Sequence, residues 1–510
     1  MTESALAESV RDVLAVDADA YQSEAASDAD FVLSELDDGT FDNHQSIIGL
    51  EYEFYAVTDD RWRTEDTTSH GLARVPRRLL ELIGFEKELG LHNAEMTANP
   101  QPFNTDGLRA IESEIRSQIT AALDCTQPEG LRLVSDALWT IPPTGETARE
   151  YLTDSIDDDG IQIATNMSDA VRYHAMANGD LDDTFRVEAP HVDIAAETLM
   201  PESLITSIQP HYQMQQAMDL PRYFTYALRI AGPLLAVAVN APFFPPDLYA
   251  DGVTGREVLA EGWQENRIAV FESVLNTATE TDKVAFPADI ESIGEAVQRV
   301  VDDETVVPMP VDRGERFHDN FATLRRKHGT FWRWVRPVFD GPSRSQANAR
   351  IEFRPLPAQP TVRDSMALTV AFAGAMEGLT RTEHPVVNLP WQAAHDNFYA
   401  AVRNGLDADI EWILADGSET TDSTAALRDL LDHAAEGLRA VGLGDETIDR
   451  YLAPLRWRID TETTPAGWKR EQVRSRLDDG ATFTAAIRGM QRQYIETQAD
   501  TLIDGDFRDW

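Results

Sequence analysis

The segment ARIEFRPLP (349–357) alternates charged and apolar residues with the two-residue period of a β-strand. Arg350, Glu352 and Arg354 fall on one face of such a strand, and the residues of the other face are mainly apolar. Three formal charges beside an apolar face are costly unless something occupies the space between them. The segment therefore predicts a strand whose charged face lines a binding site. The alternative is a cross-strand ladder of ion pairs, which contributes little on a surface.

A second segment, IGLEYEF (48–54), has the same alternation and places Glu51 and Glu53 on one face. Two neighbouring carboxylates repel each other and are hard to bury. A hard divalent cation removes both problems, because Mg²⁺ accepts carboxylate oxygens and bridges to phosphates. The alternative is the exposed polar face of an edge strand, which is a serious one in a chain this acidic.

Two further segments offer polar side chains that could bind an ion. HNAEMTANPQPFN carries Glu95 and is typical of a strand end that leads into a loop, because Asn-Pro favours a turn. SIQPHYQM alternates polar and apolar residues, so that His211 lies between Gln209 and Gln213 on one face. Pro210 in this segment favours an edge strand or a bulge. A solvated carboxylate and a structural histidine are the alternatives for these two segments.

The segment HGTFWRWVRPVF (328–339) interleaves Arg333 and Arg336 with two tryptophans, Trp332 and Trp334. Arginines in this setting can hold a carboxylate through two parallel hydrogen bonds. The alternative is aromatic packing with cation–π contacts, which is common.

Together these segments supply four carboxylates, one histidine and several arginines, which is the inventory of a metal-assisted phosphoryl-transfer site. The sequence has no G-x-x-x-x-G-K-[ST] and no G-x-G-x-x-G motif, so a P-loop or a dinucleotide fold is disfavoured. It also lacks H-E-x-x-H, which ranks a metal-dependent hydrolase last. One cysteine, Cys125, excludes an intrachain disulfide and a cysteine-based zinc site.

The charge of the chain is strongly acidic. The formal net charge is −44, and only four of the 44 basic residues are lysine. A chain this acidic repels itself at ordinary ionic strength, and molar salt screens that repulsion to within ~3 Å. We interpret the charge as a solvated acidic surface suited to a salt-rich cytoplasm.

The same composition argues against two classes of partner. No basic stripe is visible, which disfavours nucleic-acid binding. The N-terminus lacks the basic flank and apolar run of a signal peptide, and the longest apolar run (230–239) is too short to cross a bilayer. We therefore expect a soluble, cytoplasmic protein without a membrane partner. No feature indicates a particular oligomeric state.

Three regions differ in their patterns. Residues 1–45 read as an acidic, partly helical extension that carries no chemistry. Residues 46–382 intermix strands and helices and read as the catalytic core. Within them, residues 277–305 read as a loop region rich in Thr, Asp and Glu that forms a surface insertion. Residues 383–510 read as a helical segment packed on that core.

The expected elements follow from periodicity and capping signals. We expect strands at 46–57, 203–214 and 348–356. We expect helices at 104–123 with Thr105 as N-cap, at 220–239 with Pro221 in the first turn, and at 361–379 with a capping box from Thr361 and Asp364. In the C-terminal segment we expect helices at 423–442, 445–455 and 483–503.

At this point the sequence resembles the glutamate–cysteine ligases of the bacterial and archaeal type-2 family, in particular their long members. The resemblance covers roughly residues 46–510. It rests on the ordered motifs IGLEYEF, AEMTANP, SIQPHYQM, LLAVAVNAPFF, WQENRIAVF, HGTFWRWVRP and ARIEFRPLPAQPTVRD, followed by NFYAAVRNGLDADIEW and AGWKREQ. NAPFF and the asparagine of WQENRIAVF depart from the usual pattern and leave the acceptor open.

The resemblance implies an α+β, glutamine-synthetase-like fold, in which a curved antiparallel sheet with packed helices surrounds an ATP and metal site. It implies phosphorylation of the γ-carboxylate of glutamate by ATP with Mg²⁺, for which Mn²⁺ is the alternative, followed by attack of the amine of cysteine on the acyl phosphate. By motif, the metal ligands would be Glu51, Glu53, Glu95, His211 and Glu352. Glu352 and Arg354 would be catalytic, with Arg354, Arg350 and Gln209 at the nucleotide. Arg336, Trp334 and Gln213 would contact substrate.

Two alternatives stay open besides this leading hypothesis. One is a carboxylate–amine ligase with another small amine as acceptor. The other is a non-catalytic relative that keeps the fold and ATP binding, which the presence of all the expected metal ligands argues against.

Overall fold

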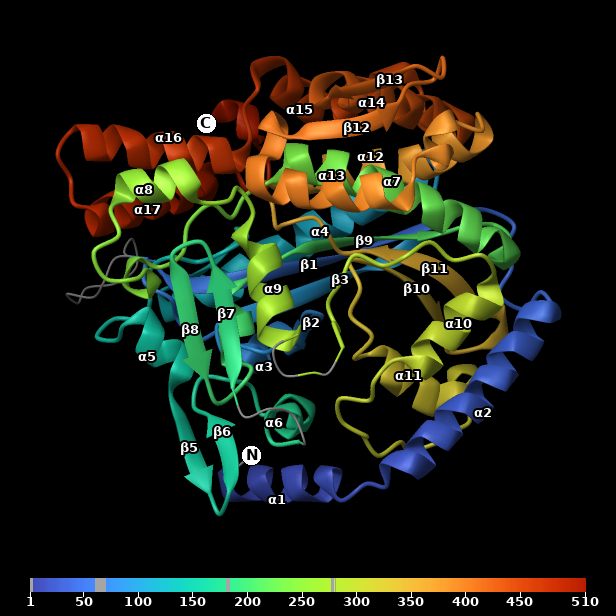
Figure 1. Ribbon diagram of the computed structural model, residues 1–510, viewed down its shortest axis with the longest axis horizontal. Coiled ribbons are helices and arrows are strands. Elements are labelled where there is room, and N and C mark those ends of the chain that lie inside the picture. The colour runs from blue at the N-terminus through green and yellow to red at the C-terminus, as the bar shows by residue number, and fades with distance from the viewer. Residues whose placement is uncertain (1–2, 60–69, 180–183, 277–278, 280) are drawn as a thin grey trace.

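The structure is a computed structural model that describes residues 3–59, 70–179, 184–276, 279 and 281–510. Within those residues, seven strands form one sheet in the order β10-β11-β9-β1-β3-β2, with β4 paired to β1, and every pair is antiparallel. The sheet curls into a half-barrel through the middle of the molecule (Figure 1). Its strands are β1 (Ile47–Thr58), β2 (Phe85–Lys87), β3 (Asn93–Pro102), β4 (Leu131–Val134), β9 (Ile208–Gln213), β10 (Val335–Asp340) and β11 (Asn348–Phe353).

Three two-stranded hairpins lie outside this sheet in the described part of the chain. They are β5 (Ser155–Asp158) with β6 (Ile161–Ala164), β7 (Phe185–Ala189) with β8 (Val192–Ala196), and β12 (Asp409–Ile413) with β13 (Glu419–Asp422).

Helices cover both faces of the sheet (Figure 1). On one side lie α4 (Thr105–Thr126), α7 (Leu220–Ala238), α12 (Val362–Arg381), α13 (Trp391–Asn404), α14 (Ser423–Ala440), α15 (Asp445–Thr461), α16 (Pro465–Asp478) and α17 (Phe483–Thr501). On the other lie α1 (Glu3–Leu14), α2 (Ala18–Asp37), α6 (Val171–Ala177), α9 (Asn266–Asn276), α10 (Ile293–Asp302) and α11 (Ala322–His328). Short helices α3 (Arg77–Glu81), α5 (Ala148–Thr153) and α8 (Gly255–Glu261) complete the set.

The alternation in the strands decides which face each helix layer meets. The apolar faces of β1 and β11 are buried, and Phe353 stacks on Phe372 of α12 with ring centroids 4.5 Å apart. Two glycines let α14 pack closely on α12, because a Cβ at Gly378 or Gly437 would overlap the backbone of the facing helix. The charged face of the sheet is thereby left to the opposite side. The predicted α+β class, with helices packed on an antiparallel sheet, is confirmed.

Several element predictions are confirmed. The helices at 220–239 and 361–379 form as α7 and α12, and Thr361 caps α12 by accepting a hydrogen bond from the Asp364 backbone N–H at 3.2 Å. Strands form at 47–58 and 348–353. The three helices predicted beyond residue 420 also form, although the hairpin β12–β13 interrupts the helical segment before them.

Three boundaries differ from the predictions. The strand expected at 203–214 begins only at Ile208, because residues 200–204 form a 3-10 turn with Pro201 at its start. The cap of α4 is Asn104, whose side-chain oxygen accepts from two backbone N–H groups, and not Thr105. The 277–305 region is not a loop throughout: α10 buries one apolar stripe and begins at a Ser292 cap. Residues 277, 278 and 280 of that region lie outside the described residues.

Two proline-bearing strands also differ. β9 is not an edge strand, since it pairs with β1 on one side and β11 on the other. The ladder with β11 covers His211 to Gln213 and stops at Pro210, where an N–H donor is missing. The segment around Glu95 does not lead into a loop but continues as a strand to Pro102. The prolines are tolerated there because β2 pairs only with residues 94–96, so that the edge beyond them has no partner strand that needs an N–H donor.

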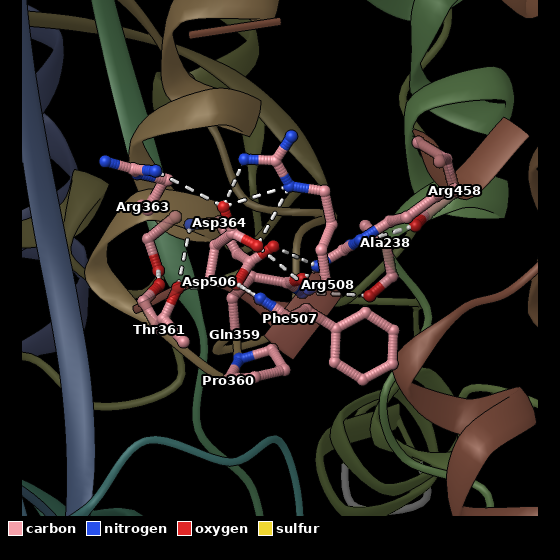
Figure 2. Close-up of polar contacts among 12 residues, drawn as sticks. Ala238, Gln359, Pro360, Thr361, Arg363, Asp364, Arg458, Asp506, Phe507 and Arg508 are labelled. Atoms are coloured by element: carbon pink, nitrogen blue, oxygen red, sulfur yellow. Dashed lines mark hydrogen bonds and ion pairs between the residues drawn. The ribbon is translucent and has the colours of Figure 1, made fainter. Parts of the chain in front are cut away.

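The C-terminal tail is fixed to the start of α12 by a buried polar network (Figure 2). Arg458 of α15 and Asp364 of α12 are fully buried and form an ion pair at 2.8 Å. Arg458 also donates to the Gln359 side-chain oxygen at 2.9 Å, and Asp364 accepts the backbone N–H of Phe507 at 3.0 Å. The network joins α12, α15 and the last residues of the chain. The division of the chain at residues 45 and 382 stays a prediction.

Candidate active site

Strand register places the predicted ligands on one face of the sheet. Directly opposite partners in an antiparallel ladder share a face. Glu51 of β1 is opposite Gln209 of β9, and Glu53 is opposite Glu95 of β3. His211 of β9 is opposite Glu352 of β11, which is in turn opposite Arg336 of β10. The face that the alternation separates from the apolar core therefore gathers side chains from five strands.

Glu51, His211 and Glu352 form a compact group. The His211 Nε2 atom lies 3.4 Å from Glu51 Oε1 and 4.0 Å from Glu352 Oε2. One ligand atom from each residue lies within 4.8 Å of the other two. His211 Nε2 is buried and has no hydrogen-bond partner. A buried nitrogen lone pair beside two carboxylates is the donor set of a divalent cation, so the residues present fit a metal ion.

The protonation states of this group differ from residue to residue. Burial, followed by the nearby Glu352 charge, raises the pKa of Glu51 to about 7. Burial lowers the pKa of His211 to about 3, so its imidazole is neutral at physiological pH. Burial opposes ionisation of Glu352 as well, but Arg336 and Arg354 hold its pKa well below the usual range. Glu352 is therefore always ionised, while Glu51 needs a further cation to ionise fully at neutral pH.

A second acidic group lies beside the first, towards β2 and β3. Glu53 accepts hydrogen bonds from the Ser207 backbone N–H at 2.6 Å and from Gln209 Nε2 at 2.9 Å. Burial, followed by the Glu88 charge, nevertheless raises its pKa to about 7. Burial and the charges of Glu51 and Glu88 raise the pKa of Glu95 well above its ordinary value. This end of the site carries more carboxylates than the described basic groups beside it neutralise.

Two arginines hold Glu352 from opposite sides. Arg336 donates to it from Nε at 2.9 Å and from Nη2 at 3.2 Å, and its Nη1 donates to the carbonyl oxygens of His328 and Phe331. Arg354 Nη1 donates to Glu352 and to Gln209, each at 2.5 Å. The buried Nε of Arg354 has no partner. Arg336 is thus committed to protein acceptors, whereas Arg354 keeps a donor for a ligand.

The charged face of the sheet opens into a cavity of about 780 Å³. Carboxylates, arginines and apolar side chains all contribute to its lining. The lining includes Glu51, Glu53, Glu86, Glu88, Glu95, Glu202, Arg172, Arg316, Arg325, Arg326, Arg336, Arg354, Phe271, Leu275, Val307, Met309 and Trp332. The volume is that of a site for a nucleotide-sized ligand. Such a cavity can hold a polyanion at its arginines, a divalent cation at its carboxylates and an apolar ring between them.

Besides His211 and Glu352, which contact the lining residues Glu51, Arg336 and Arg354 without lining the cavity themselves, the structure places three predicted residues away from the lining of this cavity. Arg350 and Gln213 lie opposite each other one row further along the sheet, and Arg350 Nη1 donates to Asn348 Oδ1 at 2.6 Å. Trp334 is buried, with its indole N–H donating to Glu272 at 2.7 Å, and it borders a smaller pocket next to Glu53 and Arg354. The ligand roles predicted for these three residues stay predictions.

Sequence reasoning missed several lining residues, among them Glu88, Glu202, Arg172, Arg325 and Arg326. Burial, followed by the Glu88 charge, raises the pKa of Glu202 to about 8. Glu86 and Glu88 alternate in FEKELG, which is a weak signal of one charged strand face. The others lie on short helices and turns whose local patterns do not reveal the cavity.

A second histidine–carboxylate group lies among the C-terminal helices. His384 Nε2 is 3.0 Å from Asp429 Oδ2, and His433 Nδ1 donates to the Asp429 backbone carbonyl at 2.8 Å. His384 Nδ1 accepts the Val386 backbone N–H. Because Nδ1 accepts, the Nε2 atom of His384 carries a proton that faces the carboxylate, where a metal would need the lone pair. We assign this group to the structural packing of α12, α14 and β12.

No helix in the described ranges combines the length and the apolar character required to cross a bilayer.

Comparisons with known proteins give one family and several distant structures. A family model described as Glutamate-cysteine ligase family 2 (GCS2) matches residues 47–500. No curated protein matches the chain significantly. A glutamate–cysteine ligase from Francisella tularensis in complex with AMP is 12% identical, with 91% of each chain covered and a TM-score of 0.48. A bifunctional glutathione synthetase from Pasteurella multocida is 14% identical, with 92% of this chain and 55% of that chain covered and a TM-score of 0.46.

Proposed function

Because this chain belongs to glutamate–cysteine ligase family 2 and is thereby a carboxylate–amine ligase, we propose that it joins the γ-carboxylate of glutamate to the amine of cysteine with ATP and Mg²⁺. The observation that carries this proposal is the unpartnered His211 Nε2 between Glu51 and Glu352, of which Glu51 lines the large cavity. A ligand set of this kind beside an arginine with a spare donor is the equipment of phosphoryl transfer.

Each residue of the face has a distinct part in this proposal. Glu51, His211 and Glu352 would hold one divalent cation, and Glu53 and Glu95 lie where they could hold another. The bound cation would neutralise charge on the transferred phosphoryl group. Arg354 would donate from its free Nε to a phosphate oxygen, while its Nη1 holds Gln209 and Glu352. Arg336 would keep Glu352 in place, which revises our prediction that it holds the substrate carboxylate.

The chemistry divides into two displacements. An oxygen of the γ-carboxylate attacks the γ-phosphorus of ATP, the bond to the β-phosphate oxygen breaks, and ADP leaves. The acceptor amine then attacks the acyl carbon, inorganic phosphate leaves with the electron pair of the C–O bond, and the amine loses a proton. Glu202 lines both pockets and would accept that proton in its ionised form. No enzyme nucleophile is needed, which agrees with the absence of a nucleophile–base pattern in the sequence.

The acceptor site would be the smaller pocket next to Glu53. Glu53, Glu88 and Glu202 line it together with the aromatic rings of Phe271 and Trp334. Carboxylates favour a cationic ammonium group, and the rings favour a small apolar or sulfur-containing side chain. The pocket therefore suits a small amino acid, and cysteine is the acceptor that the family favours.

The test is an ADP-release assay at high salt with glutamate and a panel of amines. We expect release to depend on ATP, Mg²⁺ and glutamate, and to be fastest with cysteine among cysteine, alanine, serine and methylamine. Equal rates for cysteine and alanine would rule out cysteine as the specific acceptor but would still support ligase activity. No release with any amine, in a protein that still binds ATP, would instead support a non-catalytic relative.

We also propose that the protein works in a salt-rich cytoplasm. The support is its net charge of −44, which is spread along the whole chain and is tolerated best where salt screens it. No basic stripe offers a nucleic acid a place to bind.

A further inference from the structure

The N-terminal extension contacts both walls of the cavity. α1 packs against α6, which contributes Arg172, Tyr173 and Met176 to the lining, and α2 packs against α10 and α11. In Figure 1 the two helices run in blue along the lower rim of the molecule, from α6 at one end to α11 at the other. The family match begins at residue 47, so these contacts are made by a part of the chain outside it. We call α1 and α2, residues 3–37, the N-terminal brace.

The brace supplies a cap that α11 lacks. The residue before α11 is Phe321, which has no side-chain acceptor for the first backbone N–H groups of the helix. Asp28 of α2 takes this place: its Oδ2 accepts from the backbone N–H groups of Thr323 at 2.8 Å and Leu324 at 3.2 Å. Its Oδ1 accepts from Arg313 at 2.9 Å, and the residue is buried. An aspartate from 295 positions earlier in the chain thus caps a helix of the cavity wall.

The same helix is held at its other end by α2. The Lys327 ammonium group, near the C-terminus of α11, donates to Gln22 Oε1 at 2.5 Å and to Thr305 Oγ1 at 2.9 Å. Gln22 in turn donates to the Val301 carbonyl of α10 at 2.7 Å. Lys327 is almost fully buried, so these contacts have no competition from water. Both termini of α11 are therefore fixed to one helix of the brace.

Hydrogen bonds connect α11 to Glu352 of the metal-ligand group through Arg336. The carbonyl oxygen of His328, the last residue of α11, accepts from Arg336 Nη1 at 3.1 Å. Arg336 holds Glu352 through Nε and Nη2. In addition, Arg325 and Arg326 of α11 line the cavity. A shift of α11 would move the cationic wall and loosen the support of Glu352 together.

We propose that the N-terminal brace is a working part of the active site, with Asp28 as a positioning residue for the nucleotide. Asp28 fixes the N-terminus of α11 and so sets where Arg325 and Arg326 lie in the cavity wall. The proposal rests on the proposed function, because it takes the cavity to be the nucleotide site. It replaces our prediction that the extension carries no chemistry.

The experiment compares three full-length variants with the wild type at high salt: Asp28→Ala, Asp28→Asn and, as the matched control, Asp30→Ala. Asp30 is exposed on the same helix. The measurements are the dissociation constant of ATP, the KM for ATP, kcat and the thermal unfolding midpoint. We expect Asp28→Ala to raise both the dissociation constant and the KM for ATP by about fivefold or more, as for a lost cap. Asp28→Asn should recover most of this loss, because its amide oxygen still accepts the two N–H groups, and Asp30→Ala should match the wild type.

The outcomes separate the two proposals. If the wild type itself does not bind ATP, the proposed function fails. If the wild type binds ATP and Asp28→Ala lowers only the unfolding midpoint with an unchanged KM, the residue is merely structural and the brace proposal is overturned. Should Asp28→Ala not fold, Gln22→Ala tests the same helix through Lys327. An unchanged KM in Gln22→Ala then overturns the proposal.

Discussion

At the scale of single residues, carboxylates on the same face of the sheet differ in pKa because they have different neighbours. Glu352 lies between Arg336 and Arg354, which keep it ionised. Glu51 lies on β1, which β9 separates from the strand of Glu352. It has no pair of arginines at hydrogen-bond distance, and burial raises its pKa to about 7. The ionised carboxylate can hold a cation at any physiological pH, whereas the other binds it in competition with a proton.

The first prediction concerns Glu352. We expect Glu352→Gln to lower kcat by at least about 100-fold, because the amide cannot serve as an anionic metal ligand and leaves the two arginines without their counter-charge. The measurement is the rate of ADP release with glutamate and cysteine, with circular dichroism to verify the fold.

The control for this variant is Glu86→Gln, which removes a carboxylate from an exposed position of the same cavity. It should change kcat by less than about threefold, as a solvated charge contributes little. Unchanged turnover in Glu352→Gln would sink the proposed metal site.

The second prediction concerns protons released on metal binding. Without metal, the raised pKa values of Glu51 and Glu53, about 7, mean that both are largely protonated at pH 6. A bound cation ionises them, so Mg²⁺ or Mn²⁺ should release about one to two protons at pH 6 and almost none at pH 8.5. Calorimetry in two buffers of different ionisation enthalpy measures this number.

The sign follows for stability as well. A carboxyl group whose pKa is raised on folding stabilises the metal-free protein below its unfolded pKa and loses that contribution as the pH rises towards 7. Added Mg²⁺ should therefore raise the unfolding midpoint more at pH 8 than at pH 5.5. Glu53→Gln should release fewer protons than the wild type, and equal release in both would assign the protons elsewhere.

At the scale of elements, local patterns predicted the long helices and the strand centres but misplaced several ends. The start of β9 and the cap of α4 lie within a few residues of competing signals, such as Pro201 and the pair Asn104–Thr105. α10 was missed inside an acidic stretch because its apolar stripe spans only three turns. Propensity decides that an element exists, while packing and caps decide where it ends.

The third prediction concerns the ion pair that joins α12 and α15. Arg458→Met leaves the fully buried Asp364 carboxylate without its partner, and we expect the free energy of unfolding to fall by roughly 3–5 kcal/mol. The double variant Arg458→Met/Asp364→Asn should be less destabilised than the sum of the two single variants, because it removes both charges. Denaturant titrations measure these differences.

The exposed pair Arg428–Asp460, on α14 and α15, is the matched control for this test. Arg428→Met should lower the free energy of unfolding by less than about 1 kcal/mol, since both side chains are largely solvated. If the buried and exposed pairs cost the same, the network of Figure 2 would not be what fixes the C-terminal tail.

At the scale of the whole molecule, lysine is rare, and most of the lysines are buried. Three of the four lysines, Lys283, Lys327 and Lys469, are buried and bound to acidic or polar partners. Lys87 is the exposed one, and it pairs with Asp169 at 3.1 Å. Lysine therefore serves here chiefly as a buried structural cation, while the surface is left to acidic residues and arginine.

The fourth prediction follows from the net charge of −44. Raising KCl from 0.1 M to 2 M shortens the Debye length from ~10 Å to below ~3 Å and should raise the unfolding midpoint by roughly 10 °C. Differential scanning calorimetry measures the shift. Sucrose of the same osmolality should stabilise the protein less, and an equal effect would attribute the stabilisation to solvent exclusion rather than screening.

The sequence by itself determined which side chains share a strand face. The two-residue period of a strand is a local property of the backbone, so the charged alternation of IGLEYEF and ARIEFRPLP was sufficient to separate Glu51, Glu53, Glu352 and Arg354 from the apolar core. The long amphipathic helices could be predicted from the sequence for the same reason, because helical periodicity is also a local property. The acidic surface followed from the composition.

Only the tertiary structure decided which strands are neighbours and in which register. That choice puts His211 opposite Glu352, commits Arg336 to the protein and removes Arg350 from the cavity lining. It also brings Asp28 to α11 across nearly 300 residues. These contacts depend on the global packing of the core. Because the partners lie far apart in the chain, no local sequence pattern in either segment predicts them.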